Sequence, residues 1–498
     1  MLHLSIMAVY AAASIGLFVY GTNCYVLVFL FLRCRRTAAV RNTCVIAAAQ
    51  ERFDHPEDLP RVTTQIPVYN EANVVERSLR CAAAIDYPLE LHQIQVLDDS
   101  TDETVGIVNR VADELASAGH HIQVLRRERR TGFKAGALAA GLCSATGEYV
   151  AVFDADFAPP KRFFRDTLPF FLADDRLALV QARWGHLNAA ESALTRAQAI
   201  AIDGHFMVEQ SARTFNGLMM NFNGTAGVWR RVAIEDAGGW TADTLTEDLD
   251  LSYRAQLRGW HTHFLSNLEV PGELPASLAA FKSQQFRWAK GSMQTARKLL
   301  PQILRSDIST WAKVQAFLHL THYVIHPLML VVAVFALPAV THFSRPSLVF
   351  VGVPIAAMGL AILGPNSMYM VGQRTLHAKW IRRMLWLPAL TFVGIGMAAS
   401  NTRAVFEAWI GRPSEFVRTP KRGHGAGRKA YASAKTLLPW IEIAIGLYCA
   451  MSLTVFLAAG RYAIGPLLGL YATGFLVTGV AGLAEFSGAS VDPIQSTA

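Results

Sequence analysis

Four short clusters, in a fixed order along the chain, contain the residues most able to do chemistry. Three of them are acidic, and the fourth combines amide, guanidinium and indole side chains. They are Asp98-Asp99, Asp154-Ala155-Asp156, Thr246-Glu247-Asp248 and Gln284-Gln285-Phe286-Arg287-Trp288. Any one cluster alone is weak evidence. Together they predict a transfer reaction in which a divalent ion neutralises a diphosphate and a separate carboxylate acts as base.

The Asp154 and Asp156 pair follows the apolar run Tyr149–Phe153, which is typical of a buried strand. The strand fixes the backbone, and the two carboxylates project from the turn after it. Hard oxygen ligands of this kind suit Mg²⁺ or Mn²⁺ bridging a diphosphate. The alternative interpretation is a solvated acidic turn, and only the other clusters make the metal site the better prediction.

Several residues near the ends of predicted strands are candidates for holding a nucleotide. Tyr69 and Glu71 offer an aromatic ring and a carboxylate to a nucleoside, and Lys134 offers a cation to a phosphate. Asp98 and Asp99 can accept a hydrogen bond from a base or a ribose. The Asp98-Asp99 pair also precedes Ser and Thr residues, so the same segment is compatible with a helix N-cap.

Asp248 is the candidate general base, because the carboxylates of the Asp154–Asp156 cluster are expected to be occupied by metal. The start of a surface helix is an equally good interpretation of that segment. Gln284, Arg287 and Trp288 can hold a sugar: an indole packs on the apolar face of the ring, and polar groups bind its hydroxyls. The alternative is a tryptophan that anchors an interfacial helix.

The segments around these clusters alternate between strand and helix patterns, which predicts an α/β domain with a mostly parallel sheet. The predicted strands are Val62–Pro67, Ile94–Leu97, Ile122–Leu125 and Glu148–Phe153. Apolar residues recur at helical spacing in 101–118. Ligand sites of parallel sheets lie at the carboxyl ends of the strands, which is where the aspartates fall.

The composition indicates a membrane protein. The 498 residues are 52% hydrophobic with a mean hydropathy of +0.26, and Leu4–Leu32 contains no charged residue. A helix needs roughly 20 apolar residues to cross a bilayer, and the arginines that follow at 33, 35 and 36 predict a cytosolic C-terminal end. The net charge of +8 lies largely beside hydrophobic segments, so nucleic-acid binding is not expected. The six cysteines lack metal or redox spacing.

Apolar segments return at about 316–341, 348–371, 384–400, 437–459 and 463–484. If all of them cross, the basic stretch 403–435 lies outside, against the positive-inside rule. Either 384–400 is therefore re-entrant or interfacial, or 348–383 contains a further break at Gly364-Pro365. The predicted organisation is as follows: transmembrane anchor 1–33, cytosolic catalytic domain 55–275, amphipathic interfacial segment 276–310, transmembrane or re-entrant helices 311–400, interfacial helix and gating loop 401–436, and transmembrane hairpin 437–485.

In this order the clusters resemble those of the inverting family 2 glycosyltransferases, in the processive membrane branch that includes cellulose, hyaluronan and mannan synthases. The segment Phe416-Val417-Arg418-Thr419-Pro420-Lys421 is similar to the gating loop of that branch, with Arg418 where Val is usual. The segment Asn221–Arg230 looks most like the cellulose-synthase-like A group, the glucomannan 4-β-mannosyltransferases. The resemblance implies a GT-A, Rossmann-like domain joined to an all-α transmembrane region.

The resemblance also implies roles for individual residues. The nucleoside diphosphate would be bound by Tyr69, Glu71, Asp98 or Asp99, and Lys134, with Thr419 and Lys421 closing over it. A metal would be held by Asp154 and Asp156, with Asp248 as the base. The acceptor end would contain Gln284, Arg287 and Trp288, and Asn223 stands where cellulose synthases usually have Cys.

The resulting hypothesis is a membrane-integral, inverting hexosyltransferase that elongates a β-linked glucan, mannan or glucomannan at the cytosolic face and exports it through its own helices. UDP-glucose or GDP-mannose is the expected donor, Mg²⁺ or Mn²⁺ the expected cofactor, and membrane lipids the expected surroundings, in a cell, inner or Golgi-type membrane. The first alternative is a non-processive enzyme that adds one sugar to a lipid acceptor. The second is a transporter or sensor that only binds nucleotide.

Overall fold

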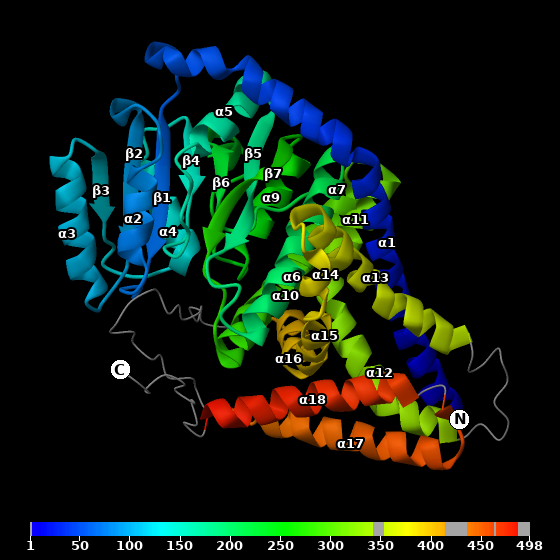
Figure 1. The fold of residues 1–498 in the computed structure, drawn as a ribbon. Coiled ribbons are helices and arrows are strands. Elements are labelled where there is room, and N and C mark those ends of the chain that lie inside the picture. Colours follow the sequence, from blue (N-terminus) through cyan, green and yellow to red (C-terminus); the bar gives the residue numbers. More distant parts are fainter. Residues whose placement is uncertain (1, 342–352, 414–435, 463–464, 487–498) are drawn as a thin grey trace.

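The computed structural model describes residues 2–341, 353–413, 436–462 and 465–486. A seven-stranded sheet with helices on both faces adjoins a group of long helices that lies beside it (Figure 1). The first helix, α1, runs along both parts. The strands are β1 Val62–Val68, β2 His92–Asp98, β3 His121–Leu125, β4 Tyr149–Val152, β5 Leu177–His186, β6 Gly227–Arg230 and β7 His261–Gly272.

Most of the helices that pack on the sheet come before residue 260, and those that form the separate group come after it. The helices up to residue 260 are α1 Leu2–Ala48, α2 Val75–Ala83, α3 Thr104–Ser117, α4 Phe133–Ser144, α5 Phe163–Ala173, α6 Ala193–Gly204, α7 Ser211–Phe215, α8 Arg231–Asp236 and α9 Glu247–Leu257. The later helices are α10 Leu278–Arg305, α11 Thr310–Leu320, α12 Ile325–Thr341, α13 Val353–Leu376, α14 Trp380–Met384, α15 Leu387–Gly396, α16 Ala398–Trp409, α17 Leu438–Ala458 and α18 Gly465–Phe486.

The strand order is β3-β2-β1-β4-β6-β5-β7. Strands β3, β2, β1 and β4 pair in parallel, and so do β5 and β7, whereas β6 is antiparallel to both of its neighbours. The mostly parallel sheet predicted from the sequence is therefore confirmed. Its four predicted strands are β1 to β4, and the predicted helix in 101–118 is α3. Strands β5, β6 and β7 were not among the predictions.

The two faces of the sheet are covered by different helices. Along β4, Tyr149 and Ala151 face the cluster that contains the phenylalanines of α5, while Val150 and Val152 face the cluster that contains α4 and β6. Side chains alternate between the faces of a strand, so a strand buried on both sides is a continuous apolar run. This is why the segment before the Asp154 cluster contains four consecutive buried residues.

Helix α1 connects the apolar helices to the sheet without a break. At 47 residues it is about 70 Å long, since an α-helix rises 1.5 Å per residue. Its first part packs against α12 and α13. Its far end reaches the sheet, where Oδ1 of Asn42 lies 3.0 Å from Nε2 of His263 at β7. One continuous helix therefore fixes the position of the sheet relative to the apolar helices.

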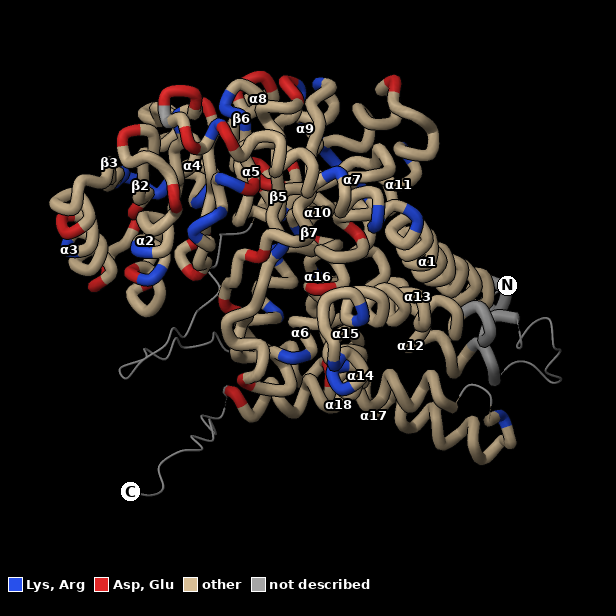
Figure 2. The backbone as a smooth tube through the Cα atoms, turned by 45° about the horizontal axis from the view of Figure 1, so that its top comes forward, with Lys and Arg blue, Asp and Glu red and all other residues tan. Residues whose placement is uncertain are grey.

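Within the part of the chain that the structure describes, three helical segments are long and apolar enough to cross a membrane: Ser5–Asp54, Leu438–Ala458 and Gly465–Glu485. Two further pairs of consecutive helices, each bent at a short break, are long and apolar enough only if the two helices are taken together as one span. They are Thr310–Leu320 with His322–Pro338, bent by 51°, and Trp380–Gly396 with Ala398–Trp409, bent by 43°. Figure 2 shows that the charged residues gather over the sheet, while α12, α17 and α18 carry very few. This distribution fits a membrane protein with a polar catalytic part.

Helix α10 is tied to the apolar helices by buried charges. Nζ of Lys282 lies 2.7 and 2.6 Å from the two carboxylate oxygens of Glu442 in α17. Nζ of Lys290 lies 2.9 Å from Oε2 of Glu407 in α16. The carboxylate of Glu485, at the end of α18, accepts from the first backbone N–H groups of α10. Helix α10 carries Gln284, Arg287 and Trp288, so these contacts position part of the candidate site.

Candidate active site

A cleft opens at the carboxyl ends of β1, β2 and β4, and it collects almost every residue singled out from the sequence. Eleven of them line it: Tyr69, Glu71, Asp99, Lys134, Asp154, Asp156, Asn223, Asp248, Gln284, Arg287 and Trp288. They come from seven separate segments spread over more than 200 residues of sequence. Parallel pairing of β1, β2 and β4 brings the ends of those strands to one edge, and the starts of α4 and α9 meet them there.

Two aspartates at the end of β4 form one wall of the cleft. Oδ1 of Asp154 lies 2.6 Å from Nζ of Lys134, in the first turn of α4. The same amine donates to the backbone carbonyl of Gly224 at 2.8 Å. Oδ2 of Asp156 accepts from the backbone N–H of Glu273 at 3.1 Å. Lys134, Asp154 and the loop at Gly224 therefore form one connected unit, and Asp156 is held separately by the backbone at Glu273.

Gly224 has to be a glycine for two reasons. Its φ is +80°, a left-handed conformation that disfavours other residues. A Cβ at this position would lie 2.9 Å from Oδ2 of Asp248 and 3.3 Å from Nζ of Lys134. The backbone can approach the carboxylate and the amine this closely only without a side chain.

Asp248 lies in the first turn of α9, beside Glu247, and is enclosed in the cleft. Its enclosure and the neighbouring Glu247 carboxylate raise the pKa of Asp248 to about 7. The pKa of Glu247 is also raised, mainly by burial. A carboxyl group with a pKa near neutrality can take up a proton during a reaction at physiological pH. The environment of Asp248 therefore suits a general base.

Two cations balance this acidic region. Burial alone would lower the pKa of Lys134, but the carboxylates of Asp154 and Glu247 outweigh that effect and hold it at about 12. Burial lowers the pKa of Arg287 to about 10, although Glu247 and Asp154 oppose the change. Both side chains therefore stay charged at neutral pH. The carboxylates of β4 and α9 thus lie within electrostatic reach of the same two cations.

At the end of the cleft near β1 and β2, arginines from the segment after β3 contact the predicted nucleoside residues. The guanidinium carbon of Arg130 lies 3.5 Å from the centroid of the Tyr69 ring. Arg127 donates to both carboxylate oxygens of Asp99, at 3.0 and 2.5 Å. A planar cation thus covers one face of the predicted stacking ring.

Asp98 does not line the cleft. Its side chain is fully buried behind Asp99, where Arg126 donates twice to Oδ2 and the backbone N–H of Ser100 donates to Oδ1. Asp98 caps no helix, because α3 begins at Thr104 with Glu103 at its N-cap; its carboxylate instead fixes the loop that follows β2. Of the two candidates, Asp99 is the one placed to meet a ligand.

The opposite end of the cleft contains the aromatic and amide side chains. Trp288 of α10 lies 6.4 Å from Trp184 of β5, centroid to centroid, and both line the cleft. Gln284 lies one turn before Trp288 on the same helix. Asn223 completes this end, where its amide lies within hydrogen-bond distance of His205 and Gln210. Two neighbouring indoles, tilted by 53° to each other, next to amides suit a carbohydrate.

Two predicted residues cannot be placed. Thr419 and Lys421 belong to the expected gating loop, which lies outside the described residues. Their proposed contact with a nucleotide therefore stays a prediction.

Several side chains of the cleft are not among those predicted from the sequence. Trp184 and His186 end β5, which was not predicted, and Glu247 was quoted without a role. Arg130 also lines the cleft. The basic run Arg126–Arg130 was a usable signal, because it follows the strand next to the one that carries Asp98 and Asp99.

Comparison with known proteins identifies the family. Residues 60–291 match the family model described as glycosyltransferase like family 2. Probable glucomannan 4-beta-mannosyltransferase 11 of Arabidopsis thaliana is 33% identical over 445 residues, which are 85% of this chain and 97% of the relative. The chain belongs to glycosyltransferase family 2. Glucomannan 4-beta-mannosyltransferase 2 of the same plant is 37% identical over 389 residues, 75% of this chain and 69% of the relative.

This family 2 glycosyltransferase is a hexosyltransferase with a GT-A-like sheet domain, and inversion is typical of the family. The resemblance to glucomannan 4-β-mannosyltransferases predicted from the sequence is confirmed. A solved structure, the mannosyltransferase PcManGT from Pyrobaculum calidifontis in complex with GDP-Man and Mn²⁺, is similar with a TM-score of 0.47 and 19% identity. The match covers 78% of this chain and 100% of that one.

Proposed function

We propose that this glycosyltransferase transfers hexose from a nucleotide sugar to a growing β-linked polysaccharide, a mannan, glucan or glucomannan, at the cytosolic membrane face. The proposal rests above all on the cleft, which Asp248 lines together with the Lys134–Asp154 pair and the Trp288–Trp184 pair. The names of the curated relatives favour mannose as the transferred sugar. UDP-glucose and GDP-mannose are the donors to test.

The nucleotide end of the cleft supplies a ring, cations and carboxylates. In this proposal Tyr69, Glu71 and Asp99 bind the nucleoside, and Lys134 binds the diphosphate. Thr419 and Lys421 close over it from the expected gating loop. Arg130 lies on the Tyr69 ring, so it shifts from that face when a base stacks there.

Asp154 and Asp156 fit a divalent ion by the chemistry of their donor atoms, because both offer carboxylate oxygens to the same cleft. No group of three or more His, Cys, Asp or Glu side chains suited to a metal occurs among the described residues. Asp154 and Asp156 are the residues that would hold such an ion. Bound there, Mg²⁺ or Mn²⁺ would neutralise charge on the leaving diphosphate.

The sugar is transferred in a single displacement. Asp248 removes the proton from the attacking acceptor hydroxyl, whose oxygen forms the new bond to the anomeric carbon. The bond from that carbon to the diphosphate oxygen breaks, and Lys134 and Arg287 lie where they stabilise the departing charge. Trp288 and Gln284 hold the acceptor sugar from the side of α10.

Membrane placement follows from α1, whose apolar part ends at Arg33, Arg35 and Arg36. The positive-inside rule puts this end, and the sheet that follows it, in the cytosol. We further propose that the enzyme adds many sugars in succession to one polysaccharide chain. It exports that polysaccharide between its apolar helices.

The decisive experiment incubates purified protein with radiolabelled GDP-mannose or UDP-glucose and Mg²⁺ or Mn²⁺, and digests the product with linkage-specific hydrolases. A product ladder sensitive to β-mannanase or β-glucanase supports the proposal. A single labelled glycolipid would show a non-processive enzyme instead. Asp248→Asn should bind nucleoside diphosphate normally while transfer falls by about 10²–10⁴-fold, as for loss of a general base. Full transfer by this variant would refute the assignment of the base.

A further inference from the structure

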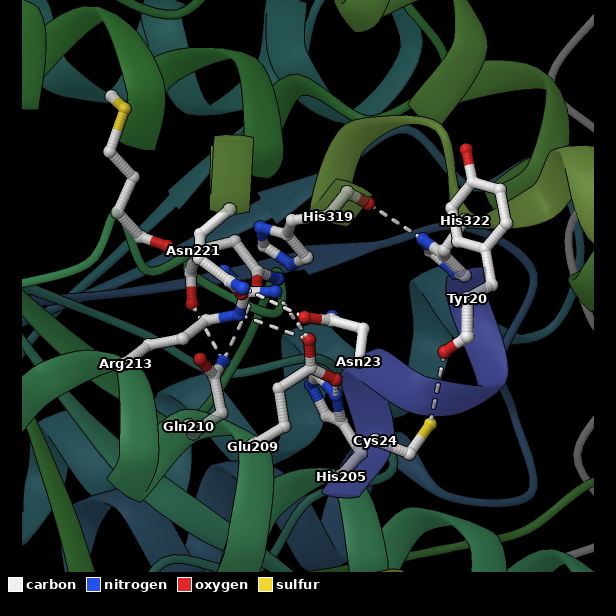
Figure 3. Close-up of polar contacts among 12 residues, drawn as sticks. Tyr20, Asn23, Cys24, His205, Glu209, Gln210, Arg213, Asn221, His319 and His322 are labelled. Atoms are coloured by element: carbon white, nitrogen blue, oxygen red, sulfur yellow. Dashed lines mark hydrogen bonds and ion pairs between the residues drawn. The ribbon is translucent and has the colours of Figure 1, made fainter. Parts of the chain in front are cut away.

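A chain of polar side chains runs from Asn223, at the acceptor end of the cleft, into the protein interior. Nδ2 of Asn223 lies 3.1 Å from Nε2 of His205, and Oδ1 of Asn223 lies 2.6 Å from Nε2 of Gln210. Nδ1 of His205 lies 2.9 Å from Oε2 of Glu209. Arg213 donates to the other carboxylate oxygen of Glu209 at 3.0 and 2.8 Å (Figure 3).

Both ends of this chain have an unambiguous donor or acceptor. The side chain of Gln210 also lies 2.9 Å from the backbone carbonyl of Asn221, which can only accept, so the amide nitrogen of Gln210 must face it. At the other end, the guanidinium of Arg213 can only donate, and the ionised Glu209 can only accept. The nitrogen and oxygen of a side-chain amide usually have to be assigned from its surroundings. Here they are fixed, because the partners at both ends can only donate or only accept.

The donor and acceptor roles of Asn223 and His205, between these two ends, follow from them. Because the nitrogen of Gln210 donates to Asn223, the atom of Asn223 that faces it is the oxygen, and Nδ2 faces His205. Nε2 of His205 must accept from Nδ2. His205 therefore carries its hydrogen on Nδ1 and donates it to Glu209. The amide of Asn223 has one orientation that satisfies all of these contacts.

A π-helical turn makes the double contact with Asn223 possible. His205–Gln210 form this turn, in which hydrogen bonds join residues five apart. In an α-helix residues five apart point about 140° away from each other, given 3.6 residues per turn. The wider turn brings both side chains to the same amide. Single π turns of this kind are frequent at functional sites.

The backbone of Asn223 is held as firmly as its side chain. Its N–H donates to Oε1 of Gln181 in β5 at 3.0 Å. The amide nitrogen of Gln181 in turn donates to the carbonyls of Ala182, Thr225 and Ala226. Side chain and backbone of Asn223 are thus oriented from two different elements, the π-helical turn and the sheet.

We propose that His205 and Gln210 are positioning residues, which fix the amide of Asn223 so that it presents its second N–H and its second oxygen lone pair to the acceptor sugar in a set order. This inference rests on the proposed function, in which the acceptor lies at this end of the cleft. A sugar hydroxyl that accepts a hydrogen bond is then bound at the amide N–H, and one that donates is bound at the amide oxygen. The π-helical turn thereby contributes to the choice of acceptor without touching it.

The test compares His205→Leu and Gln210→Met with the wild type, using mannotetraose and cellotetraose as soluble acceptors. In each variant one bond to Asn223 is lost, so KM for the acceptor should rise by about five- to tenfold, the range for one hydrogen bond. The Kd for GDP or UDP should stay within twofold. His205→Gln, which retains an acceptor oxygen, should recover part of the loss. Ser211→Ala, a buried change in the next residue of the same segment, should have no effect.

The results separate the two hypotheses. If the wild type transfers sugar and both variants keep the acceptor KM of the wild type, the positioning role is refuted and the proposed function stands. The role is also refuted if KM and the nucleotide Kd change together, because that is a general loosening of the site. Absence of transfer by the wild type with either donor refutes the proposed function itself. The nucleotide Kd also reports that each variant is folded.

Discussion

Nζ of Lys134 lies 2.6 Å from Oδ1 of Asp154, and the same lysine lies 3.9 Å from Glu247. One amine thus neutralises carboxylates from two separate parts of the chain, β4 and α9. A divalent ion held by Asp154 and Asp156 would bring further positive charge to the same carboxylates. Lys134 and such an ion would therefore both balance the negative charge of the cleft.

Lys134→Met should make this shared role visible. Loss of the amine leaves the Asp154 and Glu247 carboxylates without their nearest cation, so the free energy of unfolding should fall by about 3 kcal/mol. Mn²⁺ should then raise the melting temperature of the variant more than that of the wild type, since the ion supplies the missing charge. Lys161→Met, at an exposed position, is the control. Equal stabilisation by Mn²⁺ in variant and wild type would contradict binding beside Lys134.

The rate of transfer should depend on pH through Asp248. Its pKa is raised to about 7, and the base must be ionised to accept a proton. Activity at saturating donor should therefore rise with pH from 6 to 8 and fall about tenfold for each unit well below 7. A pH–rate profile measures this. The residual activity of Asp248→Asn should lack this step; if the step persists in the variant, another group is responsible for it.

Gly224→Ala tests how closely the backbone must approach the catalytic side chains. The new Cβ would meet Asp248 at 2.9 Å and Lys134 at 3.3 Å, and an alanine at φ +80° costs about 1–2 kcal/mol. Transfer should fall by at least tenfold because both side chains must move. Gly217→Ala is a matched control, since its φ is +65° and its Cβ would meet nothing within 4 Å. It should lose similar stability and keep full activity. Parallel losses of activity in both variants would attribute the effect to backbone strain.

Asp203 should prove important for stability. Its buried carboxylate, at the end of α6, accepts from His186 at 2.9 Å, Gln373 at 2.7 Å and His377 at 3.2 Å. Through Asp203, His186 of β5 is joined to Gln373 of α13 and to His377 just after that helix. In Asp203→Asn an amide N–H group faces these donors, so the free energy of unfolding should fall by about 2–3 kcal/mol. Thermal unfolding in detergent measures this, with the exposed Asp113→Asn as control. An unchanged melting temperature would show that the cluster contributes little.

Much of the parallel half of the sheet is predictable from local sequence patterns. Segments such as Val62–Val68 and Tyr149–Val152 are short apolar runs, and strands buried on both faces have this pattern whatever their neighbours. The acidic clusters after them could be assigned to one edge for the same reason, since parallel strands end together. Strands β5 to β7 were missed because polar residues such as Gln181 and Arg183 interrupt their pattern.

Which of the candidates meet in the cleft depends on how distant segments pack together. Asp98 and Asp99 are adjacent in sequence, but successive side chains of an extended segment point in opposite directions, so one is buried and the other lines the cleft. The polarity of the chain from Arg213 to Asn223 also depends on contacts between different elements. Sequence fixes which groups can donate, accept or ionise. Their partners, and hence their orientation and pKa, are set by packing between residues far apart in the chain.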